Sequence, residues 1–236
     1  MKAVILAGGK GTRLAPYTTV FPKPLMPLGD KPILETIIRQ LKHYGFKEIV
    51  FAVGYLAELI RAYFGDGSAF GLRILYSKEE IPLGTAGPLS LISGLEEDFL
   101  VMNGDILSSI SYSELLKTHK KNNAAATIAV NRRVMNVDYG VIKYDDKGIL
   151  QDYIEKPKLD YDVSMGIYVF NPKALKFIPK NEKLDFPDLM KTLVRSGEKV
   201  FCYKSDDYWL DIGRHEDYEK AQAESGGLKS KVFYFE

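Results

Sequence analysis

The sequence has 236 residues, enough for one large α/β domain or two small ones with a substantial buried core. Apolar residues make up 46% of it and charged residues 27%, which is the composition of a globular protein in water. The 32 basic residues are balanced by 31 acidic ones, so the sequence offers no basic surface for nucleic acid or for an anionic membrane. We therefore expect neither among the partners.

Short apolar runs alternate with segments of helical period in the first half of the chain. The runs at residues 3–7, 48–53, 72–76 and 99–103 predict strands, and the segments 33–44, 56–64 and 89–95 predict helices. This alternation is typical of three-layer α/β proteins, in which helices cover both faces of a mostly parallel, mixed sheet wound like a dinucleotide-binding fold. Ligands of such sheets bind beyond the carboxyl ends of the strands, where residues 8–13 and 103–105 fall.

The second half of the chain predicts a different arrangement. Strand-like runs at residues 124–131, 140–144, 149–154 and 165–170 are separated by turns, which favours hairpins and a small antiparallel extension of the sheet. The segments 186–196 and 215–224 predict helices, and residues 119–121 are expected at the solvated end of another. We expect one domain over residues 1–224 and a tail over 225–236, in which 231–235 are either disordered or an edge strand.

The single cysteine and the hydropathy pattern bear on the cellular compartment. Cys202 excludes an intrachain disulfide and a cysteine metal cluster, and its apolar neighbours predict that it is buried. No apolar run approaches the roughly 20 residues that cross a bilayer, and the first residues do not resemble a signal peptide. We therefore expect a cytoplasmic protein.

The glycine-rich segment after the first predicted strand is the most informative motif. Gly8, Gly9 and Gly11 let backbone N–H groups approach a polyphosphate, because no Cβ stands in the way. Arg13 and Lys23, the latter between two prolines, add positive charge. The spacing fits neither the P-loop nor the dinucleotide pattern, and a plain turn is the alternative. The motif predicts a nucleoside triphosphate site.

The segments 6–14 and 21–25 together resemble the signature of sugar-phosphate nucleotidylyltransferases, and the resemblance extends from about residue 2 to residue 224. It implies the nucleotide-diphospho-sugar transferase fold and attack of a sugar-1-phosphate oxygen on the α-phosphorus of a nucleoside triphosphate, which releases pyrophosphate. Arg13 and Lys23 match the catalytic cations. The positions matching the nucleotide site are Leu6, Ala7, Gly8, Gly9, Gly11, Thr12, Gly84, Thr85, Ala86, Asn103 and Gly104.

Two aspartates are the candidate metal ligands. Asp105 and Asp211 match the family's metal-binding aspartates, and Mg²⁺ is typically held by one or two carboxylates with substrate phosphates and water. From spacing alone, each aspartate could equally be a helix cap or a turn residue.

The candidate sugar-phosphate site draws on the second half of the chain. By resemblance, Tyr139 and Gly140 line the sugar pocket together with Gly166, while Lys156 holds the acceptor phosphate and Glu155 a hydroxyl. Strand packing is the alternative for the motifs around the two glycines. Many relatives carry Asn where this chain has Ser164, which leaves the sugar open.

The segment 79–89 is expected to face the base. Its residues 82–89 resemble mannose-1-phosphate and heptose-1-phosphate guanylyltransferases most, although part of the string also occurs in uridylyl branches. We therefore expect GTP with mannose-1-phosphate or a heptose-1-phosphate. The alternatives are a UTP- or dTTP-dependent glucose-1-phosphate nucleotidylyltransferase and a catalytically silent nucleotide-sugar sensor. A homo-oligomer is compatible with the sequence.

Overall fold

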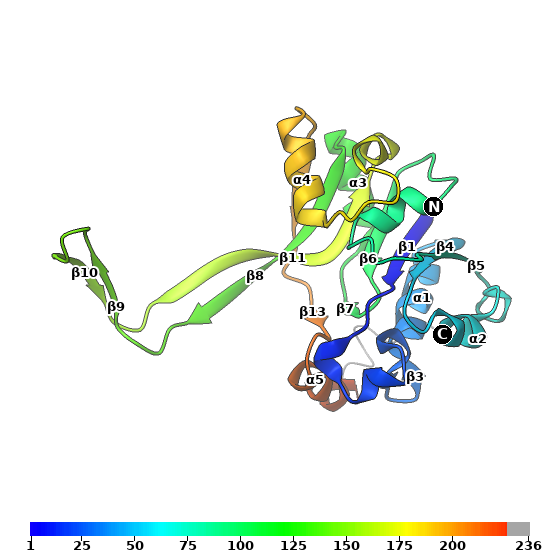
Figure 1. Cartoon of the computed structure of the whole chain (residues 1–236), viewed down its shortest axis with the longest axis horizontal. Helices are drawn as coiled ribbons and strands as arrows, with labels where there is room; N and C mark the ends of the chain where they lie inside the picture. The colour runs from blue at the N-terminus through cyan, green and yellow to red at the C-terminus, as the bar shows by residue number, and fades with distance from the viewer. Residues whose placement is uncertain (226–236) are drawn as a thin grey trace.

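The computed structural model describes residues 1–225, and its centre is a seven-stranded sheet (Figure 1). The strands run in the order β12-β8-β11-β6-β1-β4-β5. Their bounds are β1 Lys2–Ala7, β4 Glu48–Val53, β5 Arg73–Lys78, β6 Phe99–Asn103, β8 Ala126–Asn136, β11 Lys158–Phe170 and β12 Val200–Lys204.

The sheet is mixed. Strand β1 is parallel to β4 and β6, β4 is parallel to β5, and β12 is parallel to β8. Strand β11 is antiparallel to both of its neighbours, β6 and β8. The prediction of a mostly parallel, mixed sheet is confirmed, and the carboxyl ends of β1, β4, β5 and β6 meet at one edge.

Helices cover both faces of this sheet. Their bounds are α1 Ile33–His43, α2 Ala57–Phe64, α3 Tyr112–Asn122, α4 Phe186–Arg195 and α5 His215–Ser225. Because successive strand side chains point to opposite faces, Ile5 packs in a core cluster with residues of α1, α2 and α3, whereas Val4 packs with residues of α4. The predicted three-layer arrangement is confirmed.

Two short strand pairs brace the sheet edge that carries the ligand-side loops. Strand β2, Pro27–Leu28, pairs with β3, Lys31–Pro32, and β7, Ile106–Ser108, pairs with β13, Trp209–Asp211. In the second pair Asp211 lies opposite Ile106, directly after Asp105 in the chain. Residues more than a hundred positions apart in sequence are thus fixed side by side.

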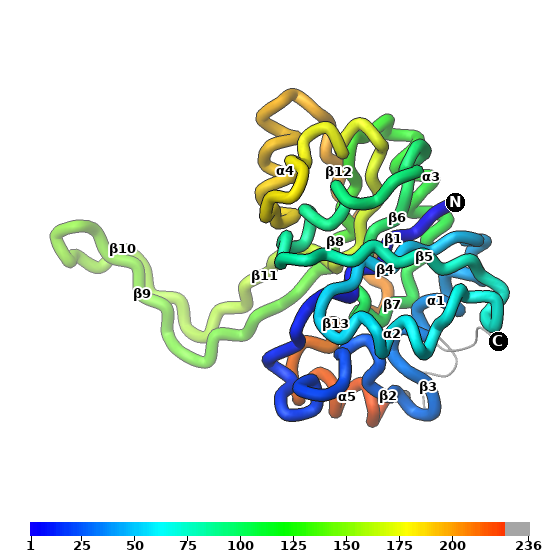
Figure 2. Tube along the Cα trace, turned by 45° about the vertical axis from the view of Figure 1, so that its right-hand side comes forward, coloured from blue at the N-terminus to red at the C-terminus, as the bar shows by residue number. Residues whose placement is uncertain are grey.

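A long antiparallel arm leaves the body. Strands β8 and β11 continue as a ribbon beyond the sheet, and the hairpin β9, Val141–Tyr144, with β10, Leu150–Ile154, forms its tip. Figures 1 and 2 show the arm projecting away from the body in both views. None of residues 131–164 is buried. The predicted antiparallel extension is therefore present, but it stands apart from the body.

Three local predictions were wrong. The segment 89–95 is not a helix: a 3₁₀ helix covers Gly87–Leu91, and Gly94 has a left-handed φ of 74°. Cys202 is exposed, because β12 is an edge strand with a neighbour on one side only. His119 is buried and hydrogen-bonded to Thr127 at 2.8 Å, although it lies near the charged end of α3.

Other predictions concern the ends of elements and the surface. Strands β8 and β11 extend well beyond the predicted runs, and the expectation for residues 231–235 lies outside the described residues.

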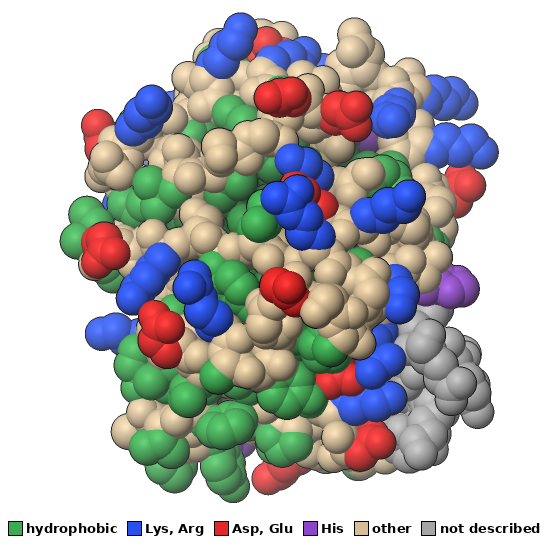
Figure 3. Space-filling view, turned by 90° about the vertical axis from the view of Figure 1, so that its right-hand side faces the viewer, with side chains coloured by type: hydrophobic (Ala, Val, Ile, Leu, Met, Phe, Trp, Pro, Cys, Tyr) green, Lys and Arg blue, Asp and Glu red, His purple; other side chains and the backbone are tan. Residues whose placement is uncertain are grey.

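None of the helices within residues 1–225 combines the length and apolar character needed to cross a bilayer. On the face opposite the arm, Lys and Arg side chains are interspersed with Asp and Glu (Figure 3).

Candidate active site

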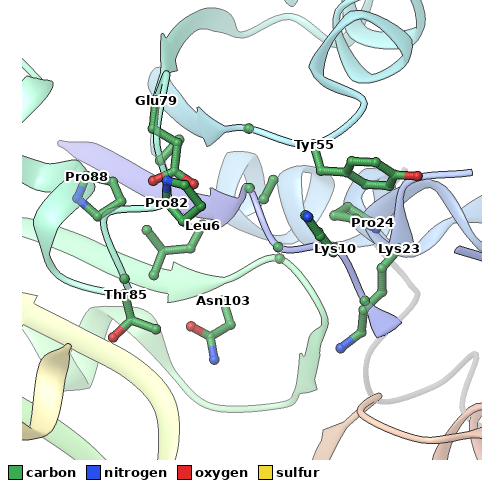
Figure 4. A pocket seen from close by; sticks show the side chains of 18 of the residues that line it. Leu6, Lys10, Lys23, Pro24, Tyr55, Glu79, Pro82, Thr85, Pro88 and Asn103 are labelled. Carbon is green, nitrogen blue, oxygen red and sulfur yellow. The ribbon is translucent and has the colours of Figure 1, made fainter. Parts of the chain in front are cut away.

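A pocket of about 880 Å³ lies at the carboxyl ends of β1, β4, β5 and β6 (Figure 4). Of the predicted nucleotide and catalytic residues, those that line it are Leu6, Ala7, Gly8, Gly9, Gly11, Thr12, Arg13, Lys23, Gly84, Thr85, Asn103 and Gly104. Asp105 lines it as well. Ala86 does not, because it is fully buried in the core cluster on the α4 face, where its N–H donates to the Leu184 carbonyl. The pocket volume lies within the range of small-molecule sites.

The glycine-rich loop is fixed on both sides and open in the middle. A Cβ at Gly8 would lie 2.9 Å from Glu79 Oε1, and Gly11 has a φ of +61° beside Thr18, whose hydroxyl donates to the Gly11 carbonyl at 2.8 Å. A Cβ at Gly9 would meet nothing within 4 Å. The first and third glycines thus position the loop, and Gly9 leaves its backbone open to the pocket.

Lys23 and Asp105 form an ion pair at one end of the pocket. Lys23 begins a 3₁₀ helix, Lys23–Leu25, which follows the extended Pro22, and only 8% of the lysine is exposed. It is therefore not an ordinary surface lysine. The second carboxylate oxygen of Asp105, Oδ1, is buried without a hydrogen-bond partner in the structure.

Asp211 and Arg13 complete this cluster. The N–H of Ile212 donates to the Asp105 carbonyl at 3.1 Å, which places Asp211 beside Asp105. Burial raises the pKa of Asp211, as does the negative charge of Asp105, while Lys23 and Arg13 oppose the shift. The Arg13 guanidinium lies against Gly213, 3.4 Å from where a Cβ would be. Asp211 is not among the residues that line the pocket, but it interacts electrostatically with Asp105, Lys23 and Arg13, so two carboxylates and two cations gather beside this end.

The donor set suits a hard divalent cation. Asp105 has an unpartnered buried oxygen, and a second carboxylate stands beside it, which are the ligands Mg²⁺ takes. Within residues 1–225 no group of three or more His, Cys, Asp or Glu side chains could hold a metal by itself. The remaining ligands would be water and substrate phosphates. The residues present therefore fit the expected Mg²⁺, and Asp105 and Asp211 are the residues that would hold it.

The pocket is polarised along its length. In Figure 4 Lys10 and Lys23 lie at one end, while Pro82, Thr85 and Asn103 lie at the other. Positive charge at one end suits a triphosphate, and the mixed apolar and amide surface at the other suits a base.

Loop 79–89, which forms the second end, is held by two carboxylates. Glu79 accepts the Leu83 N–H at 3.0 Å, and Asp185 accepts the Thr85 N–H at 2.9 Å. The Thr85 hydroxyl accepts the Phe186 N–H at 2.9 Å at the start of α4. Thr85 is thus a structural anchor of this wall as well as part of its surface.

Gly166 is the one predicted sugar-side residue that the structure places against this pocket wall. It has a φ of +70°, and a Cβ there would lie 2.7 Å from the Asn103 amide nitrogen. The Trp209 indole N–H donates to the neighbouring Met165 carbonyl at 2.8 Å and holds the strand in place. Gly166 therefore allows close contact between β11 and Asn103.

The other predicted sugar-side residues are on the arm and do not line the pocket. Tyr139 is 79% exposed, and Glu155 and Lys156 are exposed directly after β10. Lys156 has a left-handed φ of 45°. A Cβ at Gly140 would strike the Tyr153 ring, so packing alone accounts for that glycine. The structure thus assembles the nucleotide side of the candidate site and leaves the sugar side apart.

Sequence reasoning missed several residues that line the pocket. They are Pro24, Ala52, Gly54, Tyr55 and Lys78, while Lys10 falls within the segment 8–13 that was expected to meet the ligand. Gly54 and Tyr55 follow β4, and the carboxyl-end rule for parallel strands could have found them. The Tyr55 N–H donates to the Gly8 carbonyl at 3.2 Å, which ties this loop to the glycine-rich one.

Comparison with known proteins agrees with the fold. The family model described as nucleotidyl transferase matches residues 2–226, and the chain belongs to that family. It is 36% identical over 94% of its length to a UTP–glucose-1-phosphate uridylyltransferase of Synechocystis. It is also 37% identical over 92% to a probable mannose-1-phosphate guanylyltransferase of Oryza sativa. The chain spans 62% and 63% of the lengths of these relatives.

Solved structures share the fold over nearly the whole chain. HddC from Yersinia pseudotuberculosis superposes with a TM-score of 0.73 at 25% identity, covering 94% of this chain and 98% of the other. A glucose-1-phosphate thymidylyltransferase described as putative, from Bacillus anthracis, gives a TM-score of 0.75 at 24% identity and covers 95% of each chain.

Proposed function

We propose that this chain transfers a nucleotidyl group from a nucleoside triphosphate to a sugar-1-phosphate, giving an NDP-sugar and pyrophosphate. The observation that carries the proposal is the polarised pocket, in which the open backbone at Gly9 and the cluster of Lys23, Arg13 and Asp105 meet at one end. That combination supports chemistry on a phosphate chain, and membership of the nucleotidyl transferase family supports the reaction class.

The proposed reaction needs alignment and charge stabilisation from the protein. A sugar phosphate has a second pKa near ~6 and is already ionised at neutral pH, so its oxygen attacks without a general base. Attack on the α-phosphorus breaks the bond to the bridging oxygen, and pyrophosphate leaves. Lys23 and Arg13 stabilise the negative charge on the phosphate chain, and the loop N–H groups orient it. Bound Mg²⁺ would neutralise further phosphate charge from its position at Asp105 and Asp211.

For the substrates we propose GTP with mannose-1-phosphate or a heptose-1-phosphate. Residues 82–89, which resemble the guanylyl branch, include several that line the base end of the pocket, and the Oryza relative is named as a mannose-1-phosphate guanylyltransferase. A uridylyl or thymidylyl reaction on glucose-1-phosphate is the alternative, supported by the name of the Synechocystis relative. Lys23, Asp105 and Asp211 lie close together, and a protein that only binds a nucleotide does not need this arrangement. The cluster therefore argues against a catalytically silent sensor.

The test is pyrophosphate release with Mg²⁺ across a grid of GTP, UTP, dTTP, CTP and ATP against mannose-, glucose- and heptose-1-phosphates. We expect turnover concentrated at GTP with a manno-configured acceptor. Turnover at UTP or dTTP with glucose-1-phosphate would replace the proposed substrates and keep the reaction. A folded protein that binds nucleotide and is silent in the whole grid would contradict the reaction and favour the sensor.

A further inference from the structure

The arm, residues 131–164, has no buried side chain, although it is rich in large apolar residues. An isolated two-stranded ribbon is at best marginally stable in water, and a contiguous exposed apolar surface marks an interaction site. The large apolar side chains of the arm that are 38–79% exposed are Val134, Met135, Tyr139, Ile142, Tyr144, Ile149, Leu150, Tyr153, Ile154, Leu159 and Tyr161.

Four large apolar side chains at the tip share one face. Strand pairing sets Ile142 opposite Tyr153 and Tyr144 opposite Leu150, and a bulge at Gln151 brings both pairs to the same side. The other side carries the ion pair of Lys143 with Asp152 at 3.5 Å, next to the pair of Val141 with Ile154. An amphipathic hairpin of this kind is built to lie on a surface.

The body offers a matching surface beside the pocket. Tyr17, Val20 and Phe21 are 57%, 73% and 45% exposed and lie on the segment between Arg13 and Lys23. Ile81, which lines the pocket, is 59% exposed. Tyr17, Val20 and Phe21 flank in the chain the residues of the phosphate end, whereas Ile81 lies on the loop that forms the base end, and no residue of the arm lines the pocket.

We propose that two copies of this chain exchange arms, so that the arm of one copy lies across the mouth of the other copy's pocket and brings Glu155 and Lys156 to it. This inference rests on the proposed function, because these residues were matched to the sugar phosphate. The body of one copy supplies the nucleotide end of the site. The arm of its partner supplies Lys156, the positive charge proposed to bind the sugar phosphate. A two-fold axis makes the exchange reciprocal and closes the assembly.

The area available is sufficient. The eleven large side chains together expose roughly 1,000 Å² of apolar surface per arm, and a stable interface buries about 800 Å² per partner. Two reciprocal arms would double that area. A second copy would therefore cover the exposed apolar face of the arm and would supply the sugar-side residues that do not line the pocket.

The first test measures the oligomeric state and needs no activity. In sedimentation velocity we expect a dimer for the wild type and a monomer for the quadruple variant Ile142→Ser, Tyr144→Ser, Leu150→Ser, Tyr153→Ser. The matched control, Lys143→Ser with Asp152→Ser on the other face of the hairpin, stays dimeric. Because the arm contributes no buried side chain to the body, the circular dichroism spectrum of the quadruple variant should show the secondary structure of the wild type, which confirms that its body still folds. A monomeric wild type, or a quadruple variant that remains dimeric, would overturn the proposal.

The second test asks whether the arm works in trans. Lys23→Ala disables the body and Glu155→Ala with Lys156→Ala disables the arm, and the two proteins are co-expressed with different tags. Arm exchange restores about a quarter of wild-type activity, because half of the dimers are mixed and each has one site with an intact body and an intact arm. An arm that folds onto its own pocket gives no restoration, and full activity of the arm variant alone shows that the arm is not part of the site. Either result would overturn the proposal.

The two proposals fail separately. A wild type that is silent in the substrate grid contradicts the proposed function, while the sedimentation result still decides arm exchange. A wild type that is active as a monomer retains the proposed function and removes the exchange.

Discussion

The two ends of the candidate site are built differently. The nucleotide end rests on buried strands, and its loops are held by other elements, as Asp185 holds Thr85 and Tyr55 holds Gly8. The sugar-side residues stand on a ribbon without a buried side chain. Contacts within the body are enough to form the first end, whereas the second needs a surface outside its own segment. Substitutions matched between the two ends can therefore test this contrast.

The largest effect is expected at Lys23. Lys23→Met removes a charge that we place on the phosphate chain and leaves Asp105 without its ion-pair partner. We expect kcat/KM to fall by about 10²–10³-fold, as for loss of one preorganised donor to a developing anion. Steady-state kinetics of pyrophosphate release measures it. The exposed Lys121→Met is the matched control, and a similar rate for both variants would remove Lys23 from the chemistry.

A smaller and more selective effect is expected at Lys156 on the arm. Lys156→Ala removes one charge-assisted contact, so the KM for the sugar phosphate should rise by about 10–100-fold while the KM for the triphosphate changes little. The exposed Lys147→Ala near the hairpin turn is the control. An unchanged acceptor KM would contradict the assignment of Lys156.

Gly84 in the body and Gly148 in the arm have nearly the same φ, so alanine substitutions at these two positions compare how tightly the two regions are packed. Gly84 has a φ of +79° and a Cβ there would lie 2.7 Å from the Leu184 carbonyl, whereas Gly148 at +80° meets nothing within 4 Å. Alanine should lower the free energy of unfolding by about 3 kcal/mol at Gly84 and by about 1 kcal/mol at Gly148. Urea unfolding checks the difference, and equal costs would show that loop 79–89 is not tightly held.

The smallest effect is a pH dependence from His119. Burial lowers its pKa below 6.5, while the nearby Asp98 opposes the shift. The unfolded chain therefore binds more protons, so this residue reduces stability as the pH falls through 6.5, by at most about 1.4 kcal/mol per pH unit. Unfolding of His119→Gln between pH 7 and 5 should show a shallower decline than wild type, and parallel curves would contradict the shift.

The sequence was most informative where structure is local. Strands β4 and β6 have the predicted bounds, because each is a buried apolar run between clear turn signals. Helix α1 follows its apolar period from Ile33 and ends one residue before the predicted position. The glycine-rich loop, Lys23 and Asp105 line one pocket, as expected from the rule for parallel strands.

The failures come from tertiary context. Pairing of β9 with β10 follows from turn residues, but nothing in the hairpin fixes where the arm lies relative to the body. The exposure of Cys202 depends on β12 lying at the sheet edge, and the burial of His119 depends on Thr127 beneath it. Glu79 was seen as part of a base-facing segment, while its role against Gly8 required the fold.

The most direct test of the account follows the phosphorus that is transferred. GTP labelled at the α-phosphate is incubated with Mg²⁺, a manno-configured sugar-1-phosphate and the wild-type protein, and the products are separated. The account predicts that the label appears in the NDP-sugar and that unlabelled pyrophosphate forms in equal amount. Label that stays in GTP, or appears only in GMP or GDP, would contradict attack of the sugar phosphate on the α-phosphorus.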